Sequence, residues 1–161
     1  MVLRNILLNG DFGEGARYWV ESTNGAVAPI QQDVGTGASW GAELGERSGA
    51  EDEVSQDVDI RADAQRAIVI FRVKVTDPEP TGEPHSRLSL ALIAGDSSFL
   101  APVGQYDNTD AANGWIWLSS GELDVAALRG ETVTVAAAAQ AEGMTASYLD
   151  DIYLYVECIE D

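Results

Sequence analysis

Strict alternation of apolar and other side chains is the feature that most limits what this sequence can fold into. From Ala67 to Val75 every second residue is apolar and points to one side, whereas the other side turns basic at Arg72 and Lys74. A period of two places successive side chains on opposite faces of a strand, while a helix needs a period near 3.6. The segment is therefore predicted to be a strand with one face in a core.

Similar short apolar runs recur along the chain, separated by Gly, Pro, Asn and Asp, which favour turns. The alanines of Thr132–Gln140 favour a helix by intrinsic propensity, but the β-branched residues before them and Gly143 after them favour a strand. One helical turn is expected near Val125–Arg129. The nine predicted strands are Arg4–Leu8, Ala26–Gln31, Ser39–Leu44, Val54–Ile60, Ala67–Thr76, Arg87–Ala94, Trp115–Leu118, Thr132–Gln140 and Leu149–Glu157.

Nine short strands indicate an all-β sandwich, and without an internal repeat or linker the prediction is one domain over residues 1–161. Two connections stand out. Asp77–Pro84 holds three of the five prolines and is predicted to be a stiff, exposed loop. Gly95–Gly114 exceeds a hairpin turn, and we expect a long polar loop that carries Tyr106.

Charge limits the classes of partner. The chain has 9 Lys and Arg against 27 Asp and Glu, a formal charge of −18, and Lys74 is its one lysine. Nucleic acids and anionic membranes are recognised largely through basic side chains, so we expect neither as a partner. Seven carboxylates gather between Glu43 and Asp59; they could hold Ca²⁺, although we favour a solvated acidic face.

Motifs for catalysis are missing. His85 is the one histidine, which excludes a multi-histidine metal site, and we expect it to be an exposed bystander. The glycine-rich stretches lack the lysine and spacing of a phosphate loop. Asp150 and Asp151 are neighbours on a predicted strand, so they should point to opposite faces and cannot flank one glycosidic bond. We predict that the protein is not an enzyme.

The two ends of the chain carry a family resemblance. Asn5–Phe12 (NILLNGDF), Trp19 and Tyr148–Leu154 (YLDDIYL) resemble the carbohydrate-binding modules of families 4, 9, 16 and 22, with Gln56 matching an internal strand motif. Those modules are galactose-binding-like jelly-roll sandwiches of two antiparallel sheets. The resemblance therefore implies this fold and a glycan-binding, non-enzymatic function.

A structural calcium site is also implied by the resemblance. The carbonyl of Asp11 and the side chain of Asp150 match calcium ligands of the family. Gly13 stands where the family usually has a ligating Glu, so Glu14 is the expected substitute.

Sugar recognition in such modules uses aromatic faces that stack on pyranose rings, with polar groups that fix hydroxyls. Trp115 and Trp117 are two residues apart and should point the same way, either into the core or toward a ligand. Tyr153 and Tyr155 alternate with aliphatic residues, and we expect an outward pair suited to a protein interface. The candidate carbohydrate-binding residues are Trp117, Trp115, Tyr106, Trp40, Arg72 and Gln140.

The expected setting follows from what the chain lacks. We find no signal peptide, no span of about 20 apolar residues and no pair for Cys158. We therefore expect synthesis in the cytoplasm and a place on a virion surface or outside the cell. The leading hypothesis is a phage head-decoration or tail protein that forms a homo-oligomer or symmetric assembly, contacts capsid or tail proteins and binds glycans. The alternative is a stand-alone bacterial or archaeal carbohydrate-binding module.

Overall fold

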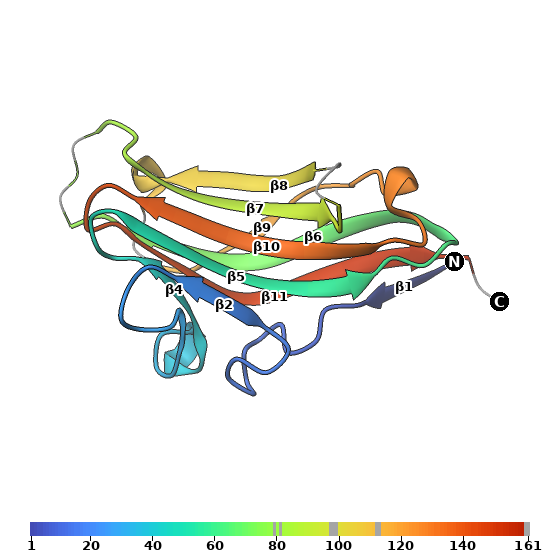
Figure 1. Cartoon of the computed structure of the whole chain (residues 1–161), viewed down its shortest axis with the longest axis horizontal. Helices are drawn as coiled ribbons and strands as arrows, with labels where there is room; N and C mark the ends of the chain where they lie inside the picture. Colours follow the sequence, from blue (N-terminus) through green and yellow to red (C-terminus); the bar gives the residue numbers. More distant parts are fainter. Residues whose placement is uncertain (79, 81, 97–99, 112–113, 160–161) are drawn as a thin grey trace.

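The computed structural model describes residues 1–78, 80, 82–96, 100–111 and 114–159, and within them eleven strands form two antiparallel sheets (Figure 1). This confirms the predicted all-β jelly-roll sandwich. The six-stranded sheet has the order β3 (Ile30–Gln31), β4 (Gly41–Gly45), β11 (Ala146–Cys158), β6 (Ala64–Thr76) and β9 (Ile116–Ser119), with β1 (Val2–Asn5) also paired to β11. The five-stranded sheet has the order β2 (Val20–Thr23), β5 (Ala50–Asp59), β10 (Thr132–Ala141), β7 (Ser86–Ala94) and β8 (Leu100–Asp107).

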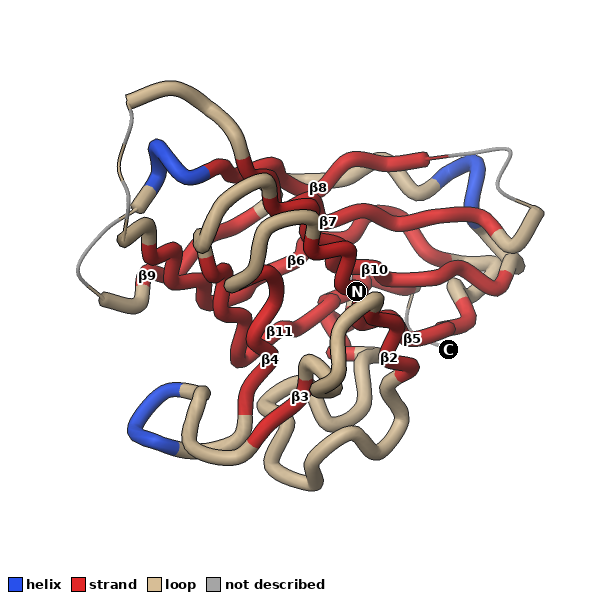
Figure 2. The backbone as a smooth tube through the Cα atoms, turned by 60° about the vertical axis from the view of Figure 1, so that its left-hand side comes forward, coloured by secondary structure: helices blue, strands red, loops and turns tan. Residues whose placement is uncertain are grey.

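The described helical segments are three 3₁₀ turns in connections between strands, drawn in blue in Figure 2. They are η1 (Thr36–Ala38), η2 (Asn108–Asp110) and η3 (Ala126–Leu128), and η3 confirms the single turn expected from the sequence. No helix in the described part of the chain is long and apolar enough to cross a membrane.

The core lies between the two sheets and follows the alternation in the sequence. In β6, Val69, Phe71 and Val73 are buried, whereas the residues between them are only partly covered. In β10, Val133 and Val135 are buried on the core side and the following alanines continue the strand. Each fully buried side chain of this size contributes about 1.5–3 kcal/mol through the hydrophobic effect. The helix propensity of the alanines is therefore overridden by pairing with β5 and β7.

Two strands of the structure were not predicted from the sequence. β2 is a four-residue edge strand, and β8 runs through the segment Gly95–Gly114 where a loop was expected. That loop prediction is wrong because Pro102 and Gly104, residues that are uncommon in strands, made the segment resemble a loop. β8 is an edge strand, and its register shifts opposite Leu90 and Ala91, which are the conditions under which a sheet tolerates proline.

Asn9 organises the turn of the N-terminal motif. The side-chain amide of Asn9 donates to the backbone carbonyls of Gly15 and Arg17, each at 2.9 Å. The backbone carbonyl of Asn9 accepts a hydrogen bond from the indole of Trp19. Gln56 on β5 exchanges two hydrogen bonds with the backbone of Leu8, at 2.8 and 2.9 Å. The motif thus joins the N-terminal segment to the five-stranded sheet.

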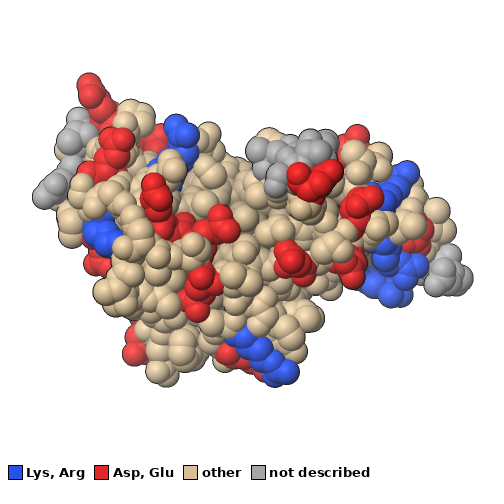
Figure 3. Space-filling model, in the orientation of Figure 1, with Lys and Arg blue, Asp and Glu red and all other residues tan. Residues whose placement is uncertain are grey.

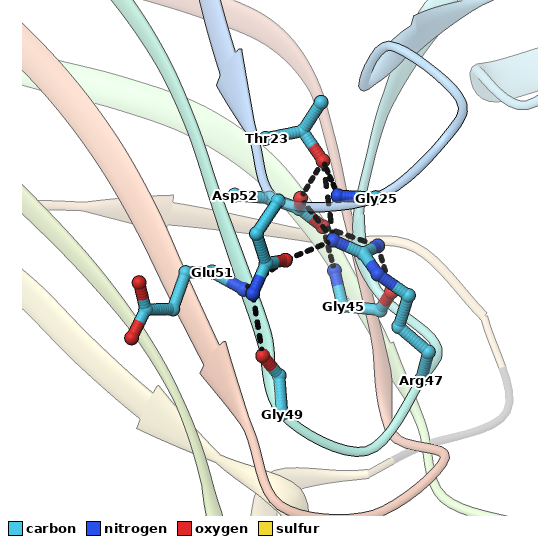
Figure 4. A network of polar contacts seen from close by, with 8 residues as sticks. Thr23, Gly25, Gly45, Arg47, Gly49, Glu51 and Asp52 are labelled. Atoms are coloured by element: carbon cyan, nitrogen blue, oxygen red, sulfur yellow. Dashed lines mark hydrogen bonds and ion pairs between the residues drawn. The ribbon is translucent and has the colours of Figure 1, made fainter.

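The acidic run is not uniformly solvated, which corrects part of the sequence interpretation. Asp52 is only 4% exposed and accepts hydrogen bonds from Thr23 Oγ1 at 2.5 Å, from the Gly45 amide at 2.8 Å and from both terminal nitrogens of Arg47 at 2.8 and 3.1 Å (Figure 4). Burial opposes ionisation of Asp52, but these hydrogen bonds outweigh it, so the pKa lies below its ordinary value. The network connects β2, β5 and the β4–β5 turn.

Candidate functional site

The outer face of the six-stranded sheet brings three of the predicted sugar-binding residues together. Alternation along β6 turns Arg72 and Lys74 away from the core, and β9 pairs with β6 so that Trp117 lies opposite Arg72. Trp115 precedes β9 and projects to the same side, which confirms that the two tryptophans point the same way. Tyr148 of β11 lies opposite Lys74 on the other flank. We call these five residues the aromatic face.

Each positive charge of the aromatic face lies against a ring. The Arg72 guanidinium carbon is 4.2 Å from the centroid of the Trp117 ring, and Trp117 remains 51% exposed. The Lys74 ammonium is 5.3 Å from the centroid of Trp115 and 4.4 Å from that of Tyr148. The Trp115 and Tyr148 rings meet edge to face, 6.3 Å apart. The sheet thus presents aromatic surface with polar donors beside it, which is what stacking on a sugar requires.

Carboxyl groups border this face on both sides. Asp151 Oδ2 lies 3.0 Å from Arg72 Nε as an ion pair. Glu43 of β4 lies opposite Tyr148, and burial, reinforced by the neighbouring Glu46, raises the pKa of Glu43 to about 7. Burial likewise raises the pKa of the Tyr148 phenol, with Glu43 and Glu46 adding to it.

A cavity of about 480 Å³ lies next to the aromatic face at the end that carries Tyr148. Thr76, which follows Lys74 on the same side of β6, is part of its lining. Thr76 pairs with Ala146 of β11, and both line the cavity. Glu46 and Met144 also line the cavity. The flat aromatic surface therefore continues into a hollow with polar and apolar groups.

Tyr153 and Tyr155 extend the same outer surface along β11. Ile152, Leu154 and Val156 are buried between and beside them, which confirms that the tyrosines face outward. Their rings lie 6.0 Å apart. Their role in a protein interface stays a prediction.

The other three predicted sugar-binding residues lie elsewhere. The ring of Tyr106 packs edge to face against Phe71 of the core, 6.0 Å away, because β8 replaces the expected loop and turns this side chain inward. Trp40 packs against the core and close to Gly15. Gln140 lies on the outer face of the other sheet. None of the three is part of the aromatic face.

The outer face of the five-stranded sheet has a different character. Its strands contain one aromatic residue, Tyr106, which faces the core. A cavity of about 450 Å³ at one end is lined by polar side chains from three strands, including Gln140, Arg87 and Gln105. His85, expected to be exposed, is half-buried at this cavity, with Nδ1 3.0 Å from Ser86 Oγ. Arg87 and Gln105 were not among the predicted site residues, although their alternation with buried residues in β7 and β8 indicates that they face outward.

The side chains of Asp150 and Glu14, two of the predicted calcium ligands, are engaged in contacts within the chain. Asp150 is buried and accepts hydrogen bonds from the Thr36 amide at 2.8 Å, the Thr36 hydroxyl at 2.9 Å and the Asp151 amide at 2.7 Å. Glu14 pairs with Arg17 at 2.7 Å, and the Asp11 carboxylate accepts from its own turn. Within the described residues, no three His, Cys, Asp or Glu side chains form a group that could hold a metal ion. The calcium site stays a prediction from the sequence.

Asp150 and Asp151 also correct the expectation that they point to opposite faces. Both contact the hydroxyl of Thr36, at 2.9 and 3.5 Å. The register of β11 against β6 shifts between Asp150 and Tyr153, and Asp151 has a positive φ of 48°. A bulge therefore breaks the alternation at this point.

The architecture is that of a carbohydrate-binding-module-like jelly roll. No protein-family model and no curated relative matches the sequence. Among solved structures, a family 61 carbohydrate-binding module in complex with β-1,4-galactotriose has a TM-score of 0.68 and 17% identity, over 96% of this chain and 99% of that chain. A family 16 carbohydrate-binding module has a TM-score of 0.63 and 15% identity, over 93% of this chain and 99% of that chain.

A phage protein shares the architecture. The enzymatically active domain of tailspike protein 4 of bacteriophage CBA120 has a TM-score of 0.60 and 11% identity, over 95% of this chain but only 21% of that chain. At these levels of identity the likeness shows the fold alone, and the function must be argued from the residues.

Proposed function

We propose that this protein is a non-catalytic module that binds glycans on the aromatic face. One observation carries the proposal: Trp117 stays 51% exposed beside Trp115 on one sheet face, although both are large apolar side chains. Apolar surface of this kind is costly to leave in water and commonly marks a binding site. The less polar face of a pyranose covers such a ring, while its hydroxyls reach neighbouring polar groups.

The surroundings of the two tryptophans support this function over a catalytic one. Arg72 and Lys74 supply hydrogen-bond donors over the faces of the two rings. The carboxyl groups nearby have surroundings within the protein that occupy them, since Asp151 pairs with Arg72 and Glu43 is partly buried next to Glu46. The likeness to modules such as the galactotriose-bound one gives independent support for a sugar as the ligand.

Affinity electrophoresis against immobilised soluble polysaccharides tests the proposal. We expect retardation of the wild type by at least one glycan and loss of that retardation in Trp117→Ala, because the stacking surface is removed. Gln140→Ala is the matched control, since Gln140 lies on the opposite sheet. Retardation that survives Trp117→Ala but is lost in Gln140→Ala would place the site in the polar cavity and refute the proposal.

We further propose that the module works on the surface of an assembly such as a virion. The tailspike with the same fold supports this setting, as does the outward pair Tyr153 and Tyr155 beside the glycan face. Light scattering of the purified protein tests it. We expect an oligomer that dissociates in Tyr153→Ser/Tyr155→Ser, and electron microscopy of the parent particle should show symmetric density. A monomer at high concentration that joins no particle contradicts this setting and favours the stand-alone module.

A further inference from the structure

Lys74 is the one lysine in a chain with 27 carboxyl side chains, yet it forms no ion pair within the part of the chain that the structure describes. Its ammonium lies instead 4.4 Å from the Tyr148 ring centroid and 5.3 Å from that of Trp115. Aromatic rings attract a cation without cancelling its charge. Lys74 is therefore held in place and remains able to attract an anion.

The charges around Lys74 leave it as the uncompensated one on the aromatic face. Arg72, the other cation, is offset by Asp151 at 3.0 Å. Glu43 interacts electrostatically with Lys74, but burial and Glu46 raise the pKa of Glu43 to about 7. At pH 6 most of the Glu43 population is therefore protonated and neutral.

The position of Lys74 also allows its ammonium to contact a bound ligand. It lies between Trp115 and the cavity of about 480 Å³ that Thr76 and Ala146 line. A sugar stacked on Trp115 and extending toward this cavity passes the ammonium. An acidic substituent of the sugar can there form a charge-assisted hydrogen bond, which is about twice as strong as a neutral one.

We propose that the aromatic face selects an anionic glycan, with Lys74 binding the carboxylate of a uronic acid or a sulfate ester on the sugar. This inference rests on the proposed glycan-binding function and names its ligand class. The excess negative charge of the protein, with Asp and Glu side chains spread over the face shown in Figure 3, repels such polymers at long range. This repulsion weakens their non-specific binding, so recognition depends on the local charge at Lys74.

Isothermal titration at pH 6 tests the inference with three probes: oligogalacturonate, a sulfated galactan oligosaccharide and a neutral β-1,4-galactan oligosaccharide. We expect at least one acidic probe to bind about tenfold more tightly than the neutral one. Lys74→Met removes the charge but keeps an unbranched apolar stem, and it should bring the acidic probe to the level of the neutral probe. The acidic probe that binds better identifies carboxylate or sulfate as the recognised group.

Arg4→Met is the matched control, because it removes one positive charge from an exposed position on β1 away from the aromatic face. It should leave the preference unchanged. Equal binding of all probes overturns the anionic selectivity, and an acidic preference that survives Lys74→Met overturns the role of Lys74. In either case Trp117-dependent binding keeps the proposed function. No binding of any probe by the wild type overturns the anionic selectivity, and the affinity electrophoresis against other polysaccharides then decides the proposed function.

Discussion

The network around Asp52 gives the sharpest stability prediction. Asp52→Asn keeps the shape of the side chain but removes its charge and turns an amide group toward Arg47. Four hydrogen bonds to the carboxylate are affected, from Thr23, Gly45 and twice from Arg47 (Figure 4). We therefore expect a substantial loss of stability from this one substitution.

The magnitude follows from burial. Removing one partner of a buried ion pair costs about 3–5 kcal/mol, but the Arg47 side chain is 37% exposed and water can solvate it after the substitution. We expect a loss of about 2–4 kcal/mol in the free energy of unfolding. For a chain of this length, a loss of about 3 kcal/mol lowers the melting temperature by about 6–12 °C.

Urea unfolding at pH 7 measures this loss, with an unchanged m-value as the check that only stability has changed. Because the pKa of Asp52 is lowered in the folded state, the stabilisation is present above the ordinary aspartate pKa and is lost as the pH falls below about 4. Asp63→Asn is the control, since its pair with Arg61 at 2.8 Å is at the surface, where water screens it and it contributes little to stability. Equal losses in both variants would refute the reasoning.

Three further predictions concern Glu43, Gly10 and the calcium site. Since the pKa of Glu43 is raised to about 7, the folded state binds the extra proton, and the stability of the wild type relative to Glu43→Gln should fall as the pH rises from 5 to 8; a constant difference contradicts this. Gly10→Ala should lower the free energy of unfolding in urea by about 2–3 kcal/mol, because the added Cβ would lie 2.0 Å from the Ile152 carbonyl oxygen. Gly13→Ala is the control and should be nearly neutral, because its Cβ would meet only the exposed Asp11 side chain, at 3.3 Å. The hydrogen bonds that occupy the Asp150 carboxylate predict the same melting temperature in calcium and in EDTA; a lower one in EDTA supports the calcium site implied by the sequence.

The sequence was informative where local periodicity and burial agree. The alternation of β6 predicted both its buried residues and the outward placement of Arg72 and Lys74. The spacing of Trp115 and Trp117 predicted their common direction. Periodicity assigns side chains to faces, however, without assigning strands to sheets. That is why Gln140 was grouped with residues of the opposite sheet.

The remaining differences come from interactions between distant parts of the chain. Asp52 belongs to an acidic run, and its burial depends on Arg47 and on pairing with β2. The bulge at Asp151 places two neighbouring carboxylates on one hydroxyl, which regular alternation cannot predict. Neither feature has a local sequence signal that sets it apart from an ordinary strand.

The indole N–H signals of the four tryptophans test the central claim most directly. In a ¹⁵N-labelled sample titrated with acidic and neutral oligosaccharides, the signals of Trp115 and Trp117 should shift with a common saturation curve. The signals of Trp19, whose indole donates to the Asn9 carbonyl at 2.9 Å, and of Trp40, which packs against the core, should stay in place. If the Trp115 and Trp117 signals do not move while the amides around Gln140 do, or if no signal moves with any sugar, the aromatic face is not a glycan-binding site.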